Sequence, residues 1–244
     1  MLKELRPAFL MMVVMTVLTG LIYPAVVTVV SQVLFAEQAN GSLVTVNGQV
    51  VGSRLIGQGF TRPEYFHPRP SAAGAGYDPT ATGGSNLGPT SAKLFNGAIK
   101  TEKGVDSVAY DGIKVRIVHY SLENEIPFDS STPLEAFKDA SGNLDDVKLI
   151  KAFSDQKTPL IFTPRTLLPA DAVTASASGL DPHVSPRNAE LQIPRVAKAR
   201  GVSVDQVRSV VEQHTGGRSL GLFGEPYVNV LEVNLALDER FARK

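Results

Sequence analysis

The sequence PAFLMMVVMTVLTGLIYPAVVTVVSQVLFA, residues 7–36, contains no charged side chain and decides how the rest of the chain is organised. Thirty residues of α-helix span about 45 Å, whereas the hydrocarbon core of a bilayer is about 30 Å thick. A cleaved signal peptide is the alternative, but its apolar region is about half as long and ends in a small-x-small site. Leu34-Phe35-Ala36 is a poor site of that kind. We therefore expect a retained transmembrane anchor.

The charges that flank this stretch predict its orientation. Lys3 and Arg6 precede it, whereas Glu37 is the first charged residue after it. Basic residues next to a transmembrane helix favour the cytoplasmic side. We expect a short cytoplasmic tail and a single-pass anchor in residues 1–36. Residues 37–244 should then form an extracytoplasmic domain.

Small or hydroxylated residues within the apolar stretch permit two interpretations. They let another helix approach closely, so they could form a packing surface for a partner's transmembrane helix. They are equally compatible with ordinary membrane-helix composition. These residues are Thr16, Thr19, Gly20, Thr28 and Ser31.

The composition excludes several classes of function. The chain has no cysteine, which excludes disulfides, thiolate metal sites and thiol nucleophiles. Lys and Arg total 24, as do Asp and Glu, so the chain lacks the basic excess expected of a nucleic-acid-binding protein. The four histidines, at positions 67, 119, 183 and 214, are not at helical ligand spacing, and we predict no metal site. A phosphate-binding G-x-x-x-x-G-K-[ST] loop and an Asp-Lys-Thr-Gly-Thr phosphorylation motif are both absent.

The remaining sequence predicts a mixed α+β domain. Asn47-Gly48 lies between two β-prone runs and predicts a hairpin. Alternating apolar residues predict strands over residues 113–118 and 228–237. Ser185-Pro186 predicts the start of a helix that Gly201 ends.

A second helix should follow directly. Ser203 and Gln206 form a capping box, and Val207, Val210 and Val211 form its apolar face. The residue spacing across this helix pair resembles a helix-turn-helix, but a neutral domain outside the cell has no DNA to bind. We predict no nucleic-acid partner.

Residues 57–90 are rich in glycine and proline but also contain aromatic residues. A flexible linker of this composition should lack aromatics. One hypothesis is that Tyr65, Phe66 and Tyr77 dock against a partner. The alternative is that they fold the loop onto its own domain.

Two motifs favour a different class, a membrane-anchored extracytoplasmic hydrolase. Residues 217–221 match G-x-S-x-G with Ser219 at the centre. A nucleophile elbow needs a strand before the serine and a helix after it, whereas the expected order here is the reverse. Asp181, His183 and Ser185 could form a catalytic cluster, although such residues before a helix usually form caps or turns.

Two dense blocks resemble the C subunit of the Kdp potassium-transporting ATPase, the KdpC family. The first block comprises Leu55-Ile-Gly-Gln-Gly-Phe60, Pro63-Glu-Tyr-Phe66, Arg69-Pro-Ser71, Tyr77 and Gly83-Gly-Ser-Asn-Leu-Gly-Pro-Thr90. The second comprises Pro169-Ala-Asp-Ala-Val-Thr-Ala-Ser176, Ser178-Gly-Leu-Asp-Pro-His-Val-Ser185, Arg195-Val-Ala-Lys-Ala-Arg200 and Gly224-Glu-Pro-Tyr-Val-Asn-Val-Leu231. Residues of about 96–165 match poorly and are expected to be an insertion without a family role. Tyr227 stands where many members carry Arg.

The resemblance implies a non-catalytic subunit of a potassium pump in the cell inner membrane, with its domain in the periplasm. Its partners would be a channel-like potassium-translocating subunit, a P-type ATP-hydrolysing subunit and the lipid bilayer. The complex, rather than this chain, would handle potassium and ATP. The family is also described as a catalytic chaperone that raises the ATP affinity of the hydrolysing subunit. We assign no catalytic or cofactor-binding residue and predict that any effect on ATP is allosteric.

Six residues are our candidates for the partner interface or for shaping the loop that carries it. They are Tyr65, Phe66, Arg69, Tyr77, Asn86 and Asp181.

Overall fold

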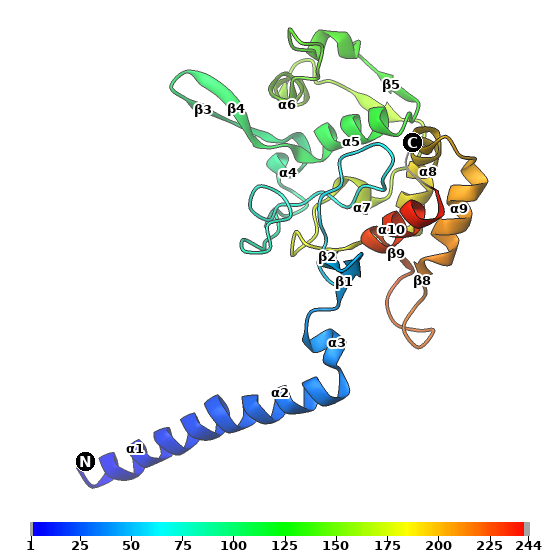
Figure 1. Ribbon diagram of the computed structural model, residues 1–244. Helices are drawn as coiled ribbons and strands as arrows, with labels where there is room; N and C mark the ends of the chain where they lie inside the picture. The colour runs from blue at the N-terminus through cyan, green and yellow to red at the C-terminus, as the bar shows by residue number, and fades with distance from the viewer. Residues whose placement is uncertain (1, 242–244) are drawn as a thin grey trace. The chain divides into compact units, whose positions relative to one another are not determined.

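The computed structural model describes residues 2–241, which form two compact units (Figure 1). The first comprises residues 1–55 and the second residues 56–244.

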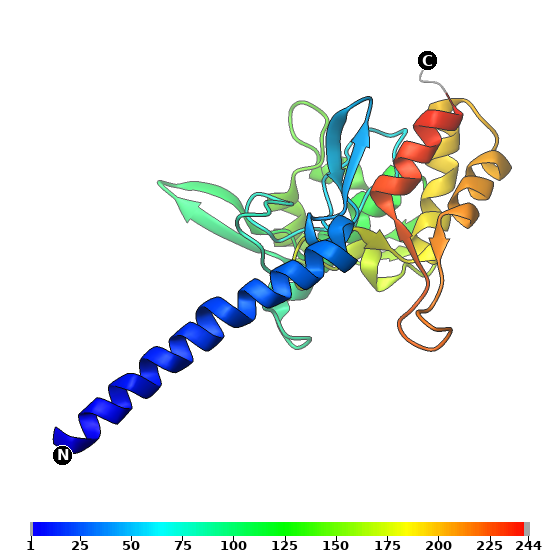
Figure 2. The same cartoon turned by 60° about the horizontal axis from the view of Figure 1, so that its bottom comes forward.

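The first unit consists mainly of one long apolar helix (Figure 2). It comprises α1 (Leu2–Val17), the π-helical turn η1 (Leu18–Ile22) and α2 (Tyr23–Leu34). Over Lys3–Leu34 the mean hydropathy reaches 2.2, and none of that window is buried within the chain. Among the described residues this is the one helix long and apolar enough to cross a membrane, as the sequence predicts.

The π-helical turn lies just before Pro24, the second residue of α2. Proline has no backbone N–H to donate and crowds the preceding turn, so the hydrogen-bond ladder must change near it. The Tyr23 N–H bonds the Leu18 carbonyl, five residues back. The hydroxyls of Thr19 and Thr28 bond carbonyls of their own helix, those of Met15 and Pro24, at 2.7 and 2.8 Å. A role for these threonines in helix packing stays a prediction.

A short segment completes the first unit. It contains α3 (Ala36–Ala39) and the antiparallel pair β1 (Leu43–Val46) and β2 (Gln49–Ser53). Asn47 and Gly48 form the turn with φ of 52° and 79°. The predicted hairpin is therefore confirmed.

The second unit mixes short antiparallel strand pairs with helices (Figure 1). β3 pairs with β4, β5 pairs with β6, and β7, β9 and β8 form a three-stranded sheet in that order. The strands are β3 (Ala98–Glu102), β4 (Val105–Tyr110), β5 (Phe128–Ser130), β6 (Phe162–Pro164), β7 (His183–Val184), β8 (Thr215–Gly216) and β9 (Tyr227–Asn229). The helices are α4 (Ala92–Asn96), α5 (Gly112–Glu123), the 3₁₀-helix η2 (Leu134–Phe137), α6 (Asp146–Ser154), α7 (Ala170–Val173), α8 (Pro186–Arg200), α9 (Val204–Gln213) and α10 (Val230–Arg240). The predicted α+β class is confirmed.

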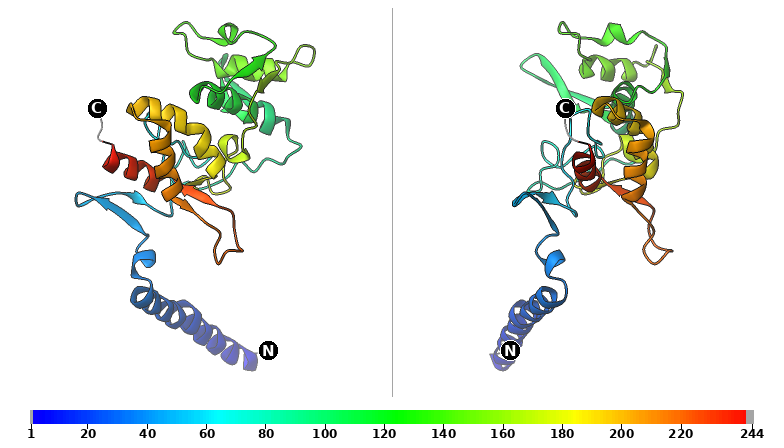
Figure 3. Two further views of the ribbon diagram at one scale, coloured as in Figure 1. Left: turned by 90° about the vertical axis from the view of Figure 1, so that its right-hand side faces the viewer. Right: turned by 45° about the vertical axis from the view of Figure 1, so that its right-hand side comes forward.

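Helices α8, α9 and α10 enclose the main core (Figure 3). The Ser185 hydroxyl caps α8, and Gly201 ends it in the left-handed conformation with φ 65°. Ser203 and Gln206 form the predicted capping box of α9. The helix pair expected from the sequence is thus present. Ile193 of α8 and Val207 of α9 belong to one buried cluster with Val228, Leu237 and, from the long loop, Phe66.

Residues 113–118 form part of α5, so the prediction of a strand there is wrong. Val115 and Val118 face one apolar cluster, whereas Ile117 and Tyr120 face another. A helix packed on two sides carries apolar residues around most of its circumference. Over six residues that pattern resembles the alternation of a strand.

Residues 230–237 also form a helix, and only β9 matches the strand predicted over 228–237. The Asn229 side chain accepts a hydrogen bond from the Glu232 N–H at 3.1 Å and caps α10. Val230, Val233 and Leu237 follow at helical spacing and are buried. The cap redirects the chain immediately after the strand.

Candidate functional site

Residues 62–67 have no regular structure, and buried side chains from α8 and α10 bind their backbone. Arg195 contributes most. Its Nη1 donates to the carbonyls of Pro63 and Tyr65 at 2.7 and 2.9 Å, and its Nε donates to Asn124 Oδ1 at 3.0 Å. Backbone groups buried outside a helix or sheet need such partners, so one guanidinium fixes the path of this loop.

Two buried amide side chains bind the next two residues of the loop. Asn234 Oδ1 accepts the Phe66 N–H at 2.8 Å, and its Nδ2 donates to the Phe66 carbonyl at 3.0 Å. Gln192 does the same for His67, at 2.7 and 3.1 Å. Both pairs reproduce the two-bond pattern of a strand partner. These bonds hold the backbone of Phe66 in place while its ring is buried in the core.

A third set of contacts fixes the aromatic ring before Phe66. The Tyr65 hydroxyl donates to Asp238 Oδ2 at 2.9 Å. Arg200 Nη2 donates to the other oxygen of Asp238 at 2.9 Å, and its Nε donates to the Glu64 carbonyl at 2.8 Å. Tyr65 is 8% exposed. This aromatic side chain therefore also serves the fold of its own unit.

The next part of the loop lies against residues 177–181, which precede α8. Ser71 Oγ donates to the Gly179 carbonyl at 2.6 Å, and Arg69 Nη1 donates to Asp181 Oδ2 at 2.9 Å. The Tyr77 hydroxyl donates to the Arg69 carbonyl. The two sequence blocks that carry the family resemblance therefore contact each other, through residues 69–71 of the first and residues 179–181 of the second.

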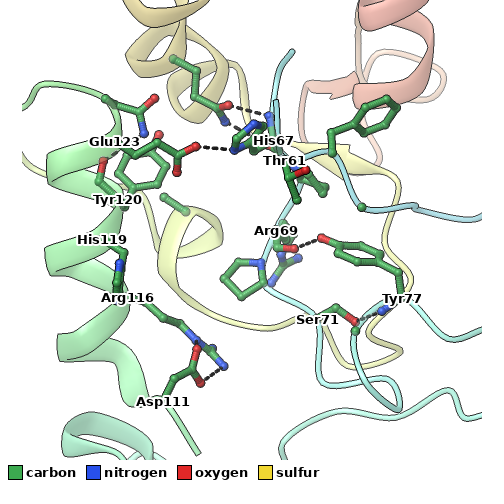
Figure 4. Close-up of a pocket in the computed structure, with 18 of the residues that line it drawn as sticks. Thr61, His67, Arg69, Ser71, Tyr77, Asp111, Arg116, His119, Tyr120 and Glu123 are labelled. Carbon is green, nitrogen blue, oxygen red and sulfur yellow. Dashed lines mark hydrogen bonds and ion pairs between the residues drawn. The ribbon is translucent and has the colours of Figure 1, made fainter. Parts of the chain in front are cut away.

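A cavity of about 500 Å³ lies between this loop, α5 and Gln192 (Figure 4). Its charged side chains are held in pairs. Arg116 forms a two-bond contact with Asp111, at 2.7 and 2.6 Å, and is 9% exposed. Because each cation neutralises a neighbouring carboxylate, the walls present little net charge.

Glu123 connects α5 to the loop. Its carboxylate pairs with His67 Nδ1 and lies 3.9 Å from Arg195 Nε. Burial raises the pKa of Glu123, but the hydrogen bond from His67 and the charges of His67 and Arg195 outweigh burial and lower it. His67 Nε2 lies 2.9 Å from the Arg62 carbonyl, so both ring nitrogens face acceptors. The imidazole of His67 therefore links α5, through Glu123, to the loop backbone at Arg62.

His119 lies one turn before Glu123 and bonds α6. Its Nε2 is 2.6 Å from Asp146 Oδ1. That hydrogen bond raises the pKa of His119 above its ordinary value, against a smaller opposing effect of burial. In the described part of the chain no three His, Asp or Glu residues are placed to hold a metal ion.

Of the residues proposed for a hydrolase, Asp181 and His183 contact each other, whereas Ser185 bonds other partners. Ser185 Oγ donates to Asp171 Oδ1 at 2.9 Å and accepts the Asn188 N–H at 3.1 Å. Asp181 pairs with Arg69, and its other oxygen lies 3.6 Å from His183 Nδ1 and accepts the His183 N–H at 3.0 Å. The His183 ring packs on Tyr227 at 4.3 Å. Burial lowers the pKa of His183, against the opposing charge of Asp181. These contacts describe a helix cap, a turn and an ion pair rather than a proton relay.

Ser219 lies in the loop that connects β8 to β9. The expected strand after the serine is present, but the element directly before the loop is the short strand β8 rather than a helix. Its N–H and carbonyl both bond Phe223. Strand β8 precedes Ser219, but the element that follows the loop is strand β9 rather than a helix, so the strand–serine–helix geometry of a nucleophile elbow is not present there.

The six candidate interface residues differ in how far they are exposed. Phe66 is fully buried and Tyr65 nearly so, which makes them loop-shaping residues. Arg69, Tyr77 and Asp181 are partly exposed, and Asn86 is exposed. A partner contact at these four positions stays a prediction. The residues that fix the loop are Gln192, Arg195, Arg200 and Asn234. Gln192, Arg195 and Arg200 lie on a helix that the sequence predicts, but Asn234 lies in the segment predicted as a strand, and the sequence gives no signal that these side chains bind the loop.

Comparison with known proteins gives one consistent result. The family model for the K+-transporting ATPase c chain, KdpC, matches residues 5–132 and 138–239. The potassium-transporting ATPase KdpC subunit of Mycobacterium tuberculosis (strain ATCC 25618 / H37Rv) is 44% identical over 97% of this chain and 98% of its own length. Those of Koribacter versatilis and Gemmatimonas aurantiaca are 43% and 44% identical over 97% and 98% of this chain, and over 94% of their own length in both cases.

These matches also revise the expectation for residues 96–165. The family model covers all of that segment except residues 133–137, and the relatives align over nearly the whole of both chains. The segment supplies α5 and with it one wall of the cavity. It therefore belongs to the length that the family shares. With the match running through both units, the chain is a member of the KdpC family of K+-transporting ATPase c chains.

Proposed function

We propose that this chain is the accessory subunit that holds a potassium-uptake pump together. Its partners are a channel-like potassium-translocating subunit and a P-type ATP-hydrolysing subunit. The observation that supports this most strongly is the family match, which runs through the apolar helix and the α+β unit alike. The accessory role uses both parts, one in the bilayer and one outside it.

The apolar helix suits contact with lipid and with partner helices. None of its most apolar window is buried within the chain, so its surface is available to other molecules. Thr16, Gly20 and Ser31 provide small side chains at which another helix can approach closely. Lys3 and Arg6 favour a cytoplasmic N-terminal side, which places the α+β unit in the periplasm, at the inner membrane.

In this topology the chain can change the ATP affinity of the hydrolysing subunit only indirectly. ATP is cytoplasmic, whereas the cavity and the loop network lie in the unit assigned to the periplasm. The helix that joins the two sides must then carry the coupling. Couplings of this kind are typically about 1–3 kcal/mol. We assign no nucleotide contact to this chain.

The experiment is purification of the full complex from mild detergent, with and without this chain, followed by measurement of potassium-stimulated ATPase activity. We expect the other subunits to co-purify with this chain and the activity to fall when it is omitted. Failure of the wild-type chain to recover any pump subunit would contradict the proposal. A hydrolase, in contrast, would show activity that does not require these partners.

A further inference from the structure

The loop between β8 and β9, residues 217–226, extends away from the helices of its unit (Figures 1 and 3). It is an ordered turn. The Ser219 N–H donates to the Phe223 carbonyl at 2.8 Å, and the Phe223 N–H donates back to Ser219 at 2.9 Å. At its base, Arg218 pairs with Glu225 at 2.8 Å. The loop therefore presents its tip in a defined conformation.

The tip of this β8–β9 loop is apolar and exposed. Leu220, Leu222 and Phe223 are 89%, 75% and 65% exposed. Leu220 also has φ 54°, a left-handed conformation that disfavours a branched side chain. Neighbouring large apolar residues on an ordered protrusion usually mark a binding surface, since water solvates them poorly.

The base of the loop is fixed to the domain. Gly216 lies directly under the Tyr227 ring, where an added Cβ would come within 2.5 Å of a ring atom. Tyr227 in turn packs on His183. A rigid base reduces the entropy lost when the tip binds, which favours a specific pocket over a loose contact.

The charges of the loop indicate the chemistry of the partner. Arg218 and Glu225 are its only charged residues, and they neutralise each other. A loop that binds anionic lipid normally carries unpaired Lys or Arg beside its apolar residues. A neutral tip with three large apolar side chains instead fits a preformed apolar pocket on a protein.

We propose that the β8–β9 loop is an anchor that inserts Leu220, Leu222 and Phe223 into an apolar pocket of another subunit of the same pump. This inference rests on the proposed function and moves the main contact away from the buried aromatics of residues 62–67. Phe223 and its two leucines form the centre of the contact, and the Arg218–Glu225 pair forms its polar rim.

The test is co-purification of the full chain with the other pump subunits from mild detergent. The variant L222S/F223S should recover about tenfold less of them, since central apolar anchors dominate binding. The matched control is Leu167→Ser, because Leu167 is 90% exposed but lies between β6 and α7. The control should recover the other subunits in wild-type amounts. The single variant Phe223→Leu, which keeps an apolar side chain at the tip, should recover them in nearly wild-type amounts. Equal unfolding midpoints for all variants are expected, because the changed side chains are exposed.

Each outcome decides a separate question. If the wild type co-purifies and L222S/F223S co-purifies equally well, the β8–β9 loop is not the anchor, although the proposed function stands. If the control loses as much as the loop variant, the contact is not specific to the loop and the inference fails. If the wild type recovers no pump subunit, the proposed function itself is wrong.

A lipid partner is tested on the purified full chain alone. The chain contains no tryptophan, so Phe223→Trp introduces a single tryptophan that can be excited selectively over the tyrosines. In vesicles of mixed neutral and anionic lipids with brominated acyl chains, we expect emission typical of solvent-exposed tryptophan, without quenching. Quenching by the brominated chains would place the tip in lipid and overturn the proposal.

Discussion

Residues 62–67 and residues 217–226 are two irregular segments that contain aromatic side chains, but their surroundings differ completely. Phe66 in the first is fully buried, whereas Phe223 in the second is 65% exposed. The first segment is bound by side chains from α8 and α10. The second makes its turn with bonds among its own residues.

The difference shows what decides whether an aromatic loop folds inward. Burial of an irregular backbone costs its hydrogen bonds to water, and Arg195, Gln192 and Asn234 replace them. The β8–β9 loop has no comparable set of donors packed against it in the described structure, and its apolar tip remains exposed. Partners elsewhere in the sequence, rather than loop composition, set the outcome.

Replacement of Arg195, the main hydrogen-bond donor to residues 62–67, should have the largest effect on stability. Arg195→Ala leaves the part-buried Pro63 carbonyl, the buried Tyr65 carbonyl and Asn124 Oδ1 without their donor, and we expect the free energy of unfolding to fall by about 3–5 kcal/mol. Urea unfolding of the full chain in mild detergent measures it. The control is Arg218→Ala in the β8–β9 loop, which should change stability by no more than about 0.5 kcal/mol. A loss below about 1 kcal/mol for Arg195→Ala would mean that the network does not fix the loop.

Two adjacent glycines test how closely the loop passes residues 177–181. An added Cβ at Gly84 would lie 2.8 Å from the Ala177 carbonyl, whereas at Gly83 nothing lies within 4 Å. Gly84→Ala should therefore cost about 1–3 kcal/mol by overpacking. Gly83→Ala should change stability by no more than about 0.5 kcal/mol. Equal midpoints for the two variants in thermal unfolding would contradict the close approach.

The smallest predicted effect is the pH dependence of the His119–Asp146 pair. The folded state raises the pKa of His119, so the pair stabilises the fold fully below the unfolded pKa of about 6.5 and loses this contribution as pH rises through the folded pKa. Because His119 is 48% exposed, we expect less than about 1 kcal/mol. Asp146→Asn should destabilise the chain more at pH 5.5 than at pH 8.5. NMR titration should show a lower His119 pKa in the variant, and an unchanged pKa would refute the pairing.

Much of the fold could be predicted because its signals are local. The apolar stretch, the Asn47-Gly48 turn and the caps at Ser185 and Ser203 each depend on a few neighbouring residues. The strand prediction for residues 113–118 failed because α5 packs on two sides. Apolar residues on both sides obscure the helical period over a window of six residues. The strand prediction for residues 230–237 failed because Asn229, the last residue of β9, also caps α10, so the helix begins with no connecting loop.

The candidate site was predictable only in part, since its contacts join distant residues. The sequence singled out both segments that meet along Ser71 and Gly179, but nothing local showed that they touch. It also left open whether Phe66 docks outward or folds inward. That choice depends on Asn234, which is 168 residues away along the chain. For residues 217–221 the sequence offers a G-x-S-x-G motif or a connection between a helix and a strand, and it does not indicate an exposed apolar tip.

The most direct test compares Phe66→Ala with Phe223→Ala in the purified full chain, with the free energy of unfolding as the readout. Phe66→Ala should cost about 3–5 kcal/mol, because it leaves a cavity in the main core. Phe223→Ala should cost no more than about 0.5 kcal/mol, because its ring lies largely in solvent. Equal losses, or a larger loss for Phe223→Ala, would contradict the assignment of one segment to the core and the other to the surface.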